Sequence, residues 1–186
     1  MAVRVPSRPH LIQRLRRRRG HNEGSAAIEF AMVALPFFFM LFAILEIGLI
    51  FITDALLENS VMETSRLIRT GEAAQASMTP AQFKTALCSR MNVFSSGCEG
   101  RTTVDVRVVP QYRNPTPKPP DPMSGSSFNT RDLDYTNGQP GNLVLVRIWY
   151  KQPMFTPFLS QALSKLGDGD SVLTATMTFR NEPWDQ

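Results

Sequence analysis

Histidine is nearly absent from this chain of 186 residues, and its two copies, His10 and His21, both lie close to the N-terminus. Beyond residue 24 the sequence therefore has no side chain for a Ser-His-Asp triad, a Cys-His pair or a histidine metal site. It also lacks a glycine-rich phosphate loop and the basic residues interleaved with aromatics that nucleic-acid surfaces need. We predict a protein that is not an enzyme, with no cofactor, no bound metal, no nucleic-acid partner and no small-molecule substrate.

Charge is scarce over one long stretch. From Phe30 to Leu45 no residue is charged, and after Glu46 the apolar run continues to Ile52. As a helix, these 23 residues would extend about 35 Å, enough to cross a hydrocarbon core of about 30 Å with some tilt. A secretory signal has a shorter apolar core of about 7–15 residues and a small-residue cleavage site after it. We therefore predict a transmembrane helix over residues 25–53.

The positive charge is concentrated at one end. Residues 1–24 contain seven arginines and one acidic residue, Glu23, whereas the rest of the chain carries a net charge of −2. Positive residues beside a span stay cytoplasmic, and the opposite flank opens with Asp54 and Glu58. We expect a basic cytoplasmic leader over residues 1–24 and an exported domain over residues 54–186.

Three features of the predicted span go beyond anchoring. A charged Glu46 inside the membrane would cost free energy, and such a carboxylate usually marks a binding partner or a function. The other interpretation is that Glu46 is protonated or extends toward water. Pro36 removes a backbone hydrogen bond, a defect that neighbouring helices often relieve. Ala27, Ala31 and Ala34 share one helical face and would let another helix approach closely. We assign these five residues to helix–helix packing.

The sequence GSAAIEF, between the arginine-rich leader and the apolar run, resembles a prepilin processing site. Such sites have a glycine before the cut and a glutamate at the fifth position of the mature chain, here Gly24 and Glu29. Glycine lets the backbone enter a protease closely. Cleavage would give Ser25 a new α-amino group, with the opposite charge of Glu29 nearby and Phe30 following it.

More narrowly, GSAAIEFAMVALPFFFMLFAILEIG resembles the N-terminal segment of the TadE-like family, the minor pilins or pseudopilins of the Flp/Tad tight-adherence pilus system. The residues that match the family pattern are Gly24, Glu29, Phe30 and Pro36. The ending over residues 178–183 is also similar to the close of such proteins. The resemblance implies a pilus assembly protein of the bacterial inner membrane, single-pass with a periplasmic C-terminal domain. Its implied partners are other pilins, pilus-assembly proteins and a prepilin peptidase, and it could enter the pilus itself.

Two other hypotheses stay open. The chain could be a membrane-tethered periplasmic binding module or enzyme whose helix is only an anchor, with Asp105, Asp132 and Asp134 as candidates for carboxylate-pair chemistry. It could also be a surface protein that adheres through a long loop. A tether has no need of Glu29 five residues after Gly24, which favours the pilus assembly protein.

Helical signals continue past the membrane. An apolar face predicts that the first helix extends from about Ser25 to Thr70 and ends before Gly71; its members are Leu57, Val61, Thr64 and Ile68. A second helix begins with Thr79 as N-cap, Pro80 in the first position and Gln82 completing a capping box, and continues to about Asn92.

Cys88 and Cys98 are the only cysteines. In an exported domain, two cysteines without a third most simply form one disulfide, and we predict that pair.

Three alternating segments predict a small antiparallel sheet under the helices, over residues 102–109, 143–151 and 171–180. Residues 110–141, rich in Pro, Ser, Asn, Asp and Gly, predict a flexible loop, and residues 158–166 a short helix. The acidic pairs at 132/134 and 168/170 do not match the twelve-residue calcium loop and are predicted to be solvated turns. The expected fold class is α+β and pilin-like: a long N-terminal helix on a small antiparallel sheet, with a second short helix.

Overall fold

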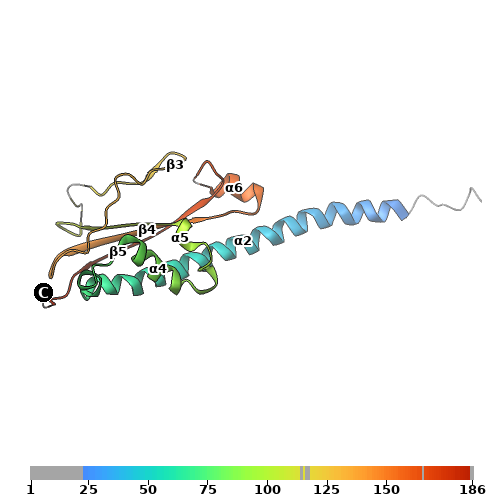
Figure 1. Cartoon of the computed structure of the whole chain (residues 1–186). Helices are drawn as coiled ribbons and strands as arrows, with labels where there is room; N and C mark the ends of the chain where they lie inside the picture. The colour runs from blue at the N-terminus through green and yellow to red at the C-terminus, as the bar shows by residue number, and fades with distance from the viewer. Residues whose placement is uncertain (1–22, 114, 116–117, 165, 185–186) are drawn as a thin grey trace, which may run out of the picture. The chain divides into compact units, whose positions relative to one another are not determined.

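The computed structural model describes residues 23–113, 115, 118–164 and 166–184 (Figure 1). The chain divides into two compact units, residues 1–42 and residues 43–186. Most of the basic leader predicted over residues 1–24 lies outside the described residues. The first described element, helix α2 (Glu23–Arg69), has nearly the bounds that the sequence predicted.

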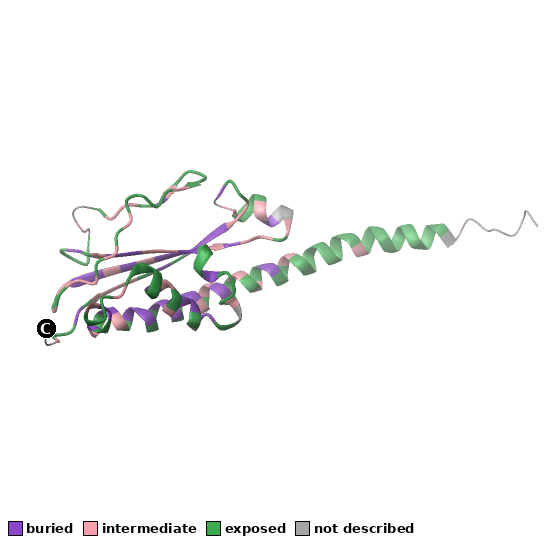
Figure 2. Cartoon of the chain, in the orientation of Figure 1, coloured by how far each residue is buried: buried purple, intermediate pink, exposed green. Residues whose placement is uncertain are grey.

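In the first unit, residues 23–42 are all helical, and residues 24–42 are almost all exposed (Figure 2). Phe38 lies between two other rings, at a centroid distance of 5.4 Å from Phe37 and 6.4 Å from Phe42. By length and composition, α2 could cross a membrane.

In the second unit, the apolar face predicted for α2 is buried. Leu57, Val61, Thr64 and Ile68 are each at most 2% exposed. The helix stops where predicted, since Gly71 has a φ of 84°, which only glycine adopts without strain. A Cβ on Gly71 would also lie 2.3 Å from the ring of Trp184, so glycine is required there for close approach as well.

Short helices α3 (Glu72–Gln75), α4 (Pro80–Arg90), η1 (Asn92–Phe94) and α5 (Cys98–Arg101) follow. The capping box of α4 is present as predicted, with the Thr79 backbone N–H donating to Gln82 and the Gln82 backbone N–H donating to Thr79 Oγ1. The helix ends at Arg90 rather than near Asn92, because Asn92 has a positive φ of 49° and begins a 3-10 turn.

Strands β1 (Thr102–Val108), β4 (Leu143–Gln152) and β5 (Ser171–Arg180) lie within one residue of the predicted bounds. They form an antiparallel sheet in the order β1-β4-β5. One face of the sheet packs with α2 and α4 in a single core. Members of this core from α2, α4, β4 and β5 include Leu57, Phe83, Val146, Ile148 and Ala175. The α+β class predicted from the sequence is confirmed.

The opposite face of the sheet is covered too, which the alternation of β1 did not predict. Trp149 and Val172 form a second cluster there with Leu166, against which Met123, Phe128 and Leu133 pack. Asp105, which alternates with the valines of β1, is 0% exposed, whereas Val108 on the other face is 42% exposed.

Residues 110–141 contain a small hairpin, β2 (Met123–Ser124) paired with β3 (Ser127–Phe128). Farther along, the Val106 N–H donates to Asp134 O and the Thr136 N–H donates to Val106 O, both at 2.8 Å, so this part of the segment lies along β1. Flexibility of the segment stays a prediction.

Helix α6 (Pro157–Leu163) is shorter than predicted, since Leu166 is buried in the turn that follows.

Candidate functional site

The residues predicted for processing lie on the first turns of α2, in the first unit. Gly24, Ser25, Glu29 and Phe30 are all exposed. The Ser25 hydroxyl donates to Glu29 Oε1 at 2.9 Å, so one helical turn joins the residue after the predicted cut to the glutamate. A Cβ built on Gly24 would meet nothing within 4 Å. The fold therefore does not require glycine at this position, and any such requirement would come from another molecule.

The predicted packing face is open. Ala27 and Ala31 are exposed and Ala34 is half-buried. Pro36 lies inside α2 and does not end it, although its missing N–H leaves the carbonyl four residues earlier without a helical donor. The described part of this unit is one helix, so its apolar surface is available for lipid or for other helices.

Glu46 lies in a different environment, within the second unit. It is 5% exposed, although it lies among apolar residues of α2 that are exposed. Its Oε1 accepts the backbone N–H of Phe155, and its Oε2 accepts the N–H of Thr156 at 2.9 Å. Both donors come from the segment between β4 and α6. The helix-packing role predicted for Glu46 is not tested by these bonds; they show that the side chain has an acceptor role inside its own unit.

A second buried carboxylate, Asp105, is held by two arginines. Arg147, its cross-strand partner, donates to Oδ2 at 2.7 Å and Arg107 donates to both oxygens, while the Asp134 N–H donates to Oδ1 at 3.0 Å. Burial alone would raise the pKa of Asp105, but the hydrogen bonds from Arg107, from Asp134 and from Arg147 outweigh it, so its pKa is lowered. The side chain is saturated by donors, which suits a structural link and not a general base.

Asp132 and Asp134, the other candidates for carboxylate chemistry, are exposed. The Asp134 carboxylate accepts the backbone N–H of Tyr135 and the hydroxyl of Thr136, as in a turn. Asp168 likewise accepts the N–H of Asp170. Within the described ranges, no group of three His, Cys, Asp or Glu side chains is placed to hold a metal ion.

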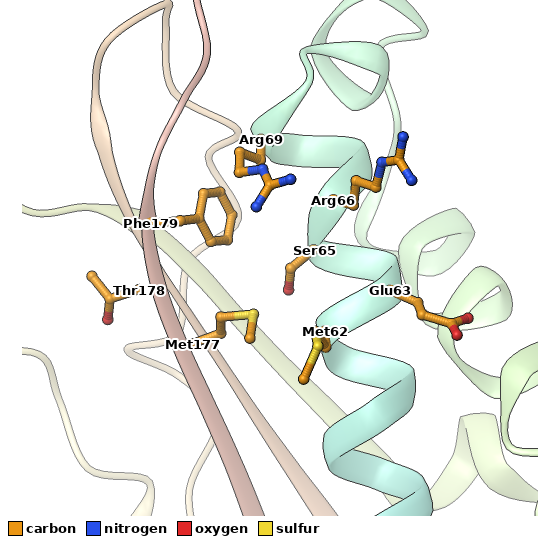
Figure 3. Close-up of a pocket in the computed structure, with 8 residues that line it drawn as sticks. All are labelled: Met62, Glu63, Ser65, Arg66, Arg69, Met177, Thr178 and Phe179. Atoms are coloured by element: carbon orange, nitrogen blue, oxygen red, sulfur yellow. The ribbon is translucent and has the colours of Figure 1, made fainter.

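A cavity of about 480 Å³ lies between α2 and the edge strand β5 (Figure 3). Its lining residues are Met62, Glu63, Ser65, Arg66, Arg69, Met177, Thr178 and Phe179. Two of the charged lining residues form ion pairs within the unit, Glu63 with Arg90 at 3.4 Å and Arg69 with Glu182 at 3.2 Å. Neither a nucleophile–base pair nor a metal-binding group occurs among these lining residues.

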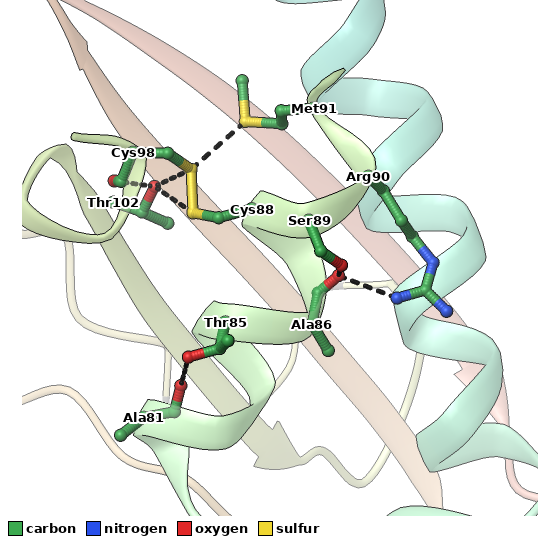
Figure 4. The surroundings of a disulfide bond; sticks show 9 residues. All are labelled: Ala81, Thr85, Ala86, Cys88, Ser89, Arg90, Met91, Cys98 and Thr102. Atoms are coloured by element: carbon green, nitrogen blue, oxygen red, sulfur yellow. Dashed lines mark hydrogen bonds between the residues drawn. A yellow bond between two sulfur atoms is a disulfide. The ribbon is translucent and has the colours of Figure 1, made fainter. Parts of the chain in front are cut away.

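The predicted disulfide is present and joins Cys88 on α4 to Cys98 on α5, with the Cα atoms 5.7 Å apart (Figure 4). Both cysteines are buried. Thr102 Oγ1 donates to Cys98 O at 2.8 Å, which ties the start of β1 to the same corner. The bond is a buried structural cross-link.

Sequence reasoning identified the exposed helix segment and the disulfide. It missed the amides of Phe155 and Thr156 on Glu46 and the two arginines on Asp105. The charge pattern gave one usable signal: if 102–109 and 143–151 pair so that Asp105 is opposite Arg147, opposite charges meet.

The comparisons with known proteins agree with the helix segment. The family model described as TadE-like protein matches residues 24–66, so the predicted resemblance to that family is confirmed over this segment. The match covers the processing and packing residues, Glu46, and the first buried turns of the outer part of α2. No curated protein and no solved structure matches the chain.

Proposed function

Starting from the TadE-like match over residues 24–66, we propose that this chain is a minor pilin or pseudopilin of a Flp/Tad pilus, anchored in the inner membrane by α2. The leader faces the cytoplasm and residues 54–186 are periplasmic. The protein takes part in pilus biogenesis and adherence by packing its helix against other pilins and assembly proteins. The proposal includes no catalytic role.

The observation that carries this proposal is the state of the N-terminal part of α2. Phe30, Val33 and Leu35 are at least 70% exposed, in a helix that no other described residue of its unit covers. A lipid bilayer satisfies such a surface, and a bundle of like helices does so equally well. Glu29 is exposed at the start of the same surface, where its carboxylate can form an ion pair with a positively charged group of a neighbouring subunit.

Processing after Gly24 is the second part of the proposal. Cleavage by a prepilin peptidase would leave Ser25 as the first residue, one turn from Glu29. The new α-amino group and the carboxylate would be an opposite-charge pair within one chain or between neighbouring chains.

The test is Glu29→Ala, with Glu58→Ala as the matched control because Glu58 is also an exposed glutamate of α2. We expect Glu29→Ala to lower the number of surface pili strongly while membrane insertion is unchanged, since the apolar span is intact. Ser25→Ala removes the hydroxyl bond but keeps the carboxylate, and should assemble pili normally.

Normal pili with Glu29→Ala would contradict the proposal and favour the alternative, a membrane-tethered periplasmic binding module or enzyme. Equal loss with Ser25→Ala would indicate that the bond to Glu29, and not its charge toward a partner, is what matters.

A further inference from the structure

We propose that the segment between β4 and α6, together with α6, is a second membrane-contacting element that enters the outer leaflet beside α2 and is attached there by Glu46. This inference rests on the membrane placement of α2 in the proposed function.

Glu46 lies close to the outer end of the apolar run of α2. It lies six residues before Ile52, the last residue of the apolar run, which corresponds to about 9 Å along a helix. The amides of Phe155 and Thr156 donate to the two oxygens of its carboxylate. The segment therefore lies at the level of Glu46. If the apolar residues around Glu46 are in lipid, the backbone at Phe155 lies at the same depth.

Exposed apolar residues lie at the level of Glu46 both on α2 and on the segment that follows β4. On α2, Ile44, Phe51 and Ile52 are each more than half exposed. In the distant segment, Phe155 is 75% exposed and Leu163 of α6 is 42% exposed. Residues 152–164 contain no Asp, Glu, Lys or Arg. Exposed apolar side chains therefore lie at the same level on α2 and on the segment, so a bilayer that surrounds the helix at this level also reaches the segment. Elements that lie in the interface bury apolar residues about 5–10 Å deep, which matches the depth of Glu46.

The Glu46 carboxylate and the backbone amides just before α6 satisfy each other's hydrogen-bonding needs. Backbone N–H groups at the start of a helix have no acceptor within the helix, and in hydrocarbon each N–H without an acceptor costs free energy. A glutamate side chain in the same place would be equally costly. Here each satisfies the other, with both carboxylate oxygens used. The pairing allows the segment to enter lipid and accounts for a glutamate in a membrane span without a second protein.

The experiment uses the full chain, alone, in lipid nanodiscs. Single cysteines are introduced and labelled with an environment-sensitive fluorophore; the native cysteines are joined to each other and do not react. Lipids with a nitroxide high on the acyl chain then quench labels that contact the bilayer. Labels replace Phe155 and Leu163, with Ser126, exposed in the β2–β3 turn, as the water control and Val33 as the insertion control.

We expect labels at 33, 155 and 163 to be quenched several-fold more than the label at 126. Quenching at 33 with none at 155 and 163 would overturn the inference and leave the membrane placement of α2 standing. No quenching at 33 would overturn both.

The attachment by Glu46 has its own readout. Glu46→Ala removes both acceptors, so quenching at 155 should fall toward that at 126 while quenching at 33 persists. Glu46→Gln keeps one acceptor oxygen and should give an intermediate value. The near-ultraviolet circular dichroism of buried Trp149 verifies that each variant is folded. A folded Glu46→Ala variant with unchanged quenching at 155 would overturn the role of Glu46.

Discussion

The same kind of side chain meets opposite surroundings in the two units of this chain. In residues 43–186, Leu57, Phe83 and Ile148 are fully buried by elements of their own unit. In residues 23–42, Phe30 and Leu35 are more than 70% exposed. Apolar composition is common to both; what differs is whether described residues of the same unit cover the side chains. The described part of the first unit is one exposed helix, for which we propose lipid or partner helices as the cover, whereas the second is a folded domain with two apolar clusters.

The comparison predicts, first, that shortening a leucine has a large effect in only one unit. Leu57→Ala should lower the free energy of unfolding of the domain by about 2–5 kcal/mol, because it leaves a cavity in a closed core. Leu35→Ala, the matched change in the exposed helix, should leave it unchanged. Denaturant unfolding in detergent micelles, followed by the near-ultraviolet signal of Trp149, measures both. Equal losses of unfolding free energy in Leu57→Ala and Leu35→Ala would contradict the difference in burial between the two units.

A second, smaller effect concerns the charge buried in the domain. Asp105→Asn leaves Arg107 and Arg147 without their carboxylate and should cost about 3 kcal/mol. Glu58→Gln, an exposed control, should cost little.

The pH dependence of unfolding gives a sharper test of the same carboxylate. The pKa of Asp105 in the folded protein is lowered, so its contribution is present above the unfolded value of about 3.9 and is lost as the pH falls through the folded value. Asp105→Asn should therefore flatten the acid side of the stability profile. An unchanged acid dependence would contradict the role of the buried ion pairs.

The smallest effect on domain stability is expected at Gly24. A Cβ there meets nothing within 4 Å, and the same is true of Gly48 in the second unit. Neither Gly24→Ala nor Gly48→Ala should shift the unfolding midpoint. The fraction of protein cleaved after residue 24 in cells, measured by intact mass, should fall in Gly24→Ala and fall further in Gly24→Leu. In Gly48→Ala it should be normal. Full cleavage of Gly24→Leu would contradict a glycine-dependent processing site.

Features that depend on neighbours in the sequence were predictable. The capping box at Thr79 and Gln82, the stop at Gly71 and the bounds of the three strands all follow from local spacing and backbone preference. The disulfide followed from counting, because a pair of cysteines has one possible connection.

Features that depend on distant partners were not. The alternation of β1 separated Asp105 from the valines, but the segment that covers its face, residues 123–135, has no local pattern that reveals where it packs. Glu46 was recognised as costly, yet its donors are 109 and 110 residues away. Burial of these carboxylates is a property of the tertiary fold, because each is stabilised by groups that only the fold brings near.

The most direct test of the central claim is the intact mass and N-terminal sequence of the protein extracted from its own membranes. The proposed function predicts a chain that begins at Ser25, without the arginine-rich leader. A chain that still begins at Met1 or Ala2 would contradict processing as a pilin, and would identify a permanent single-pass membrane protein that cannot leave the membrane as a processed subunit.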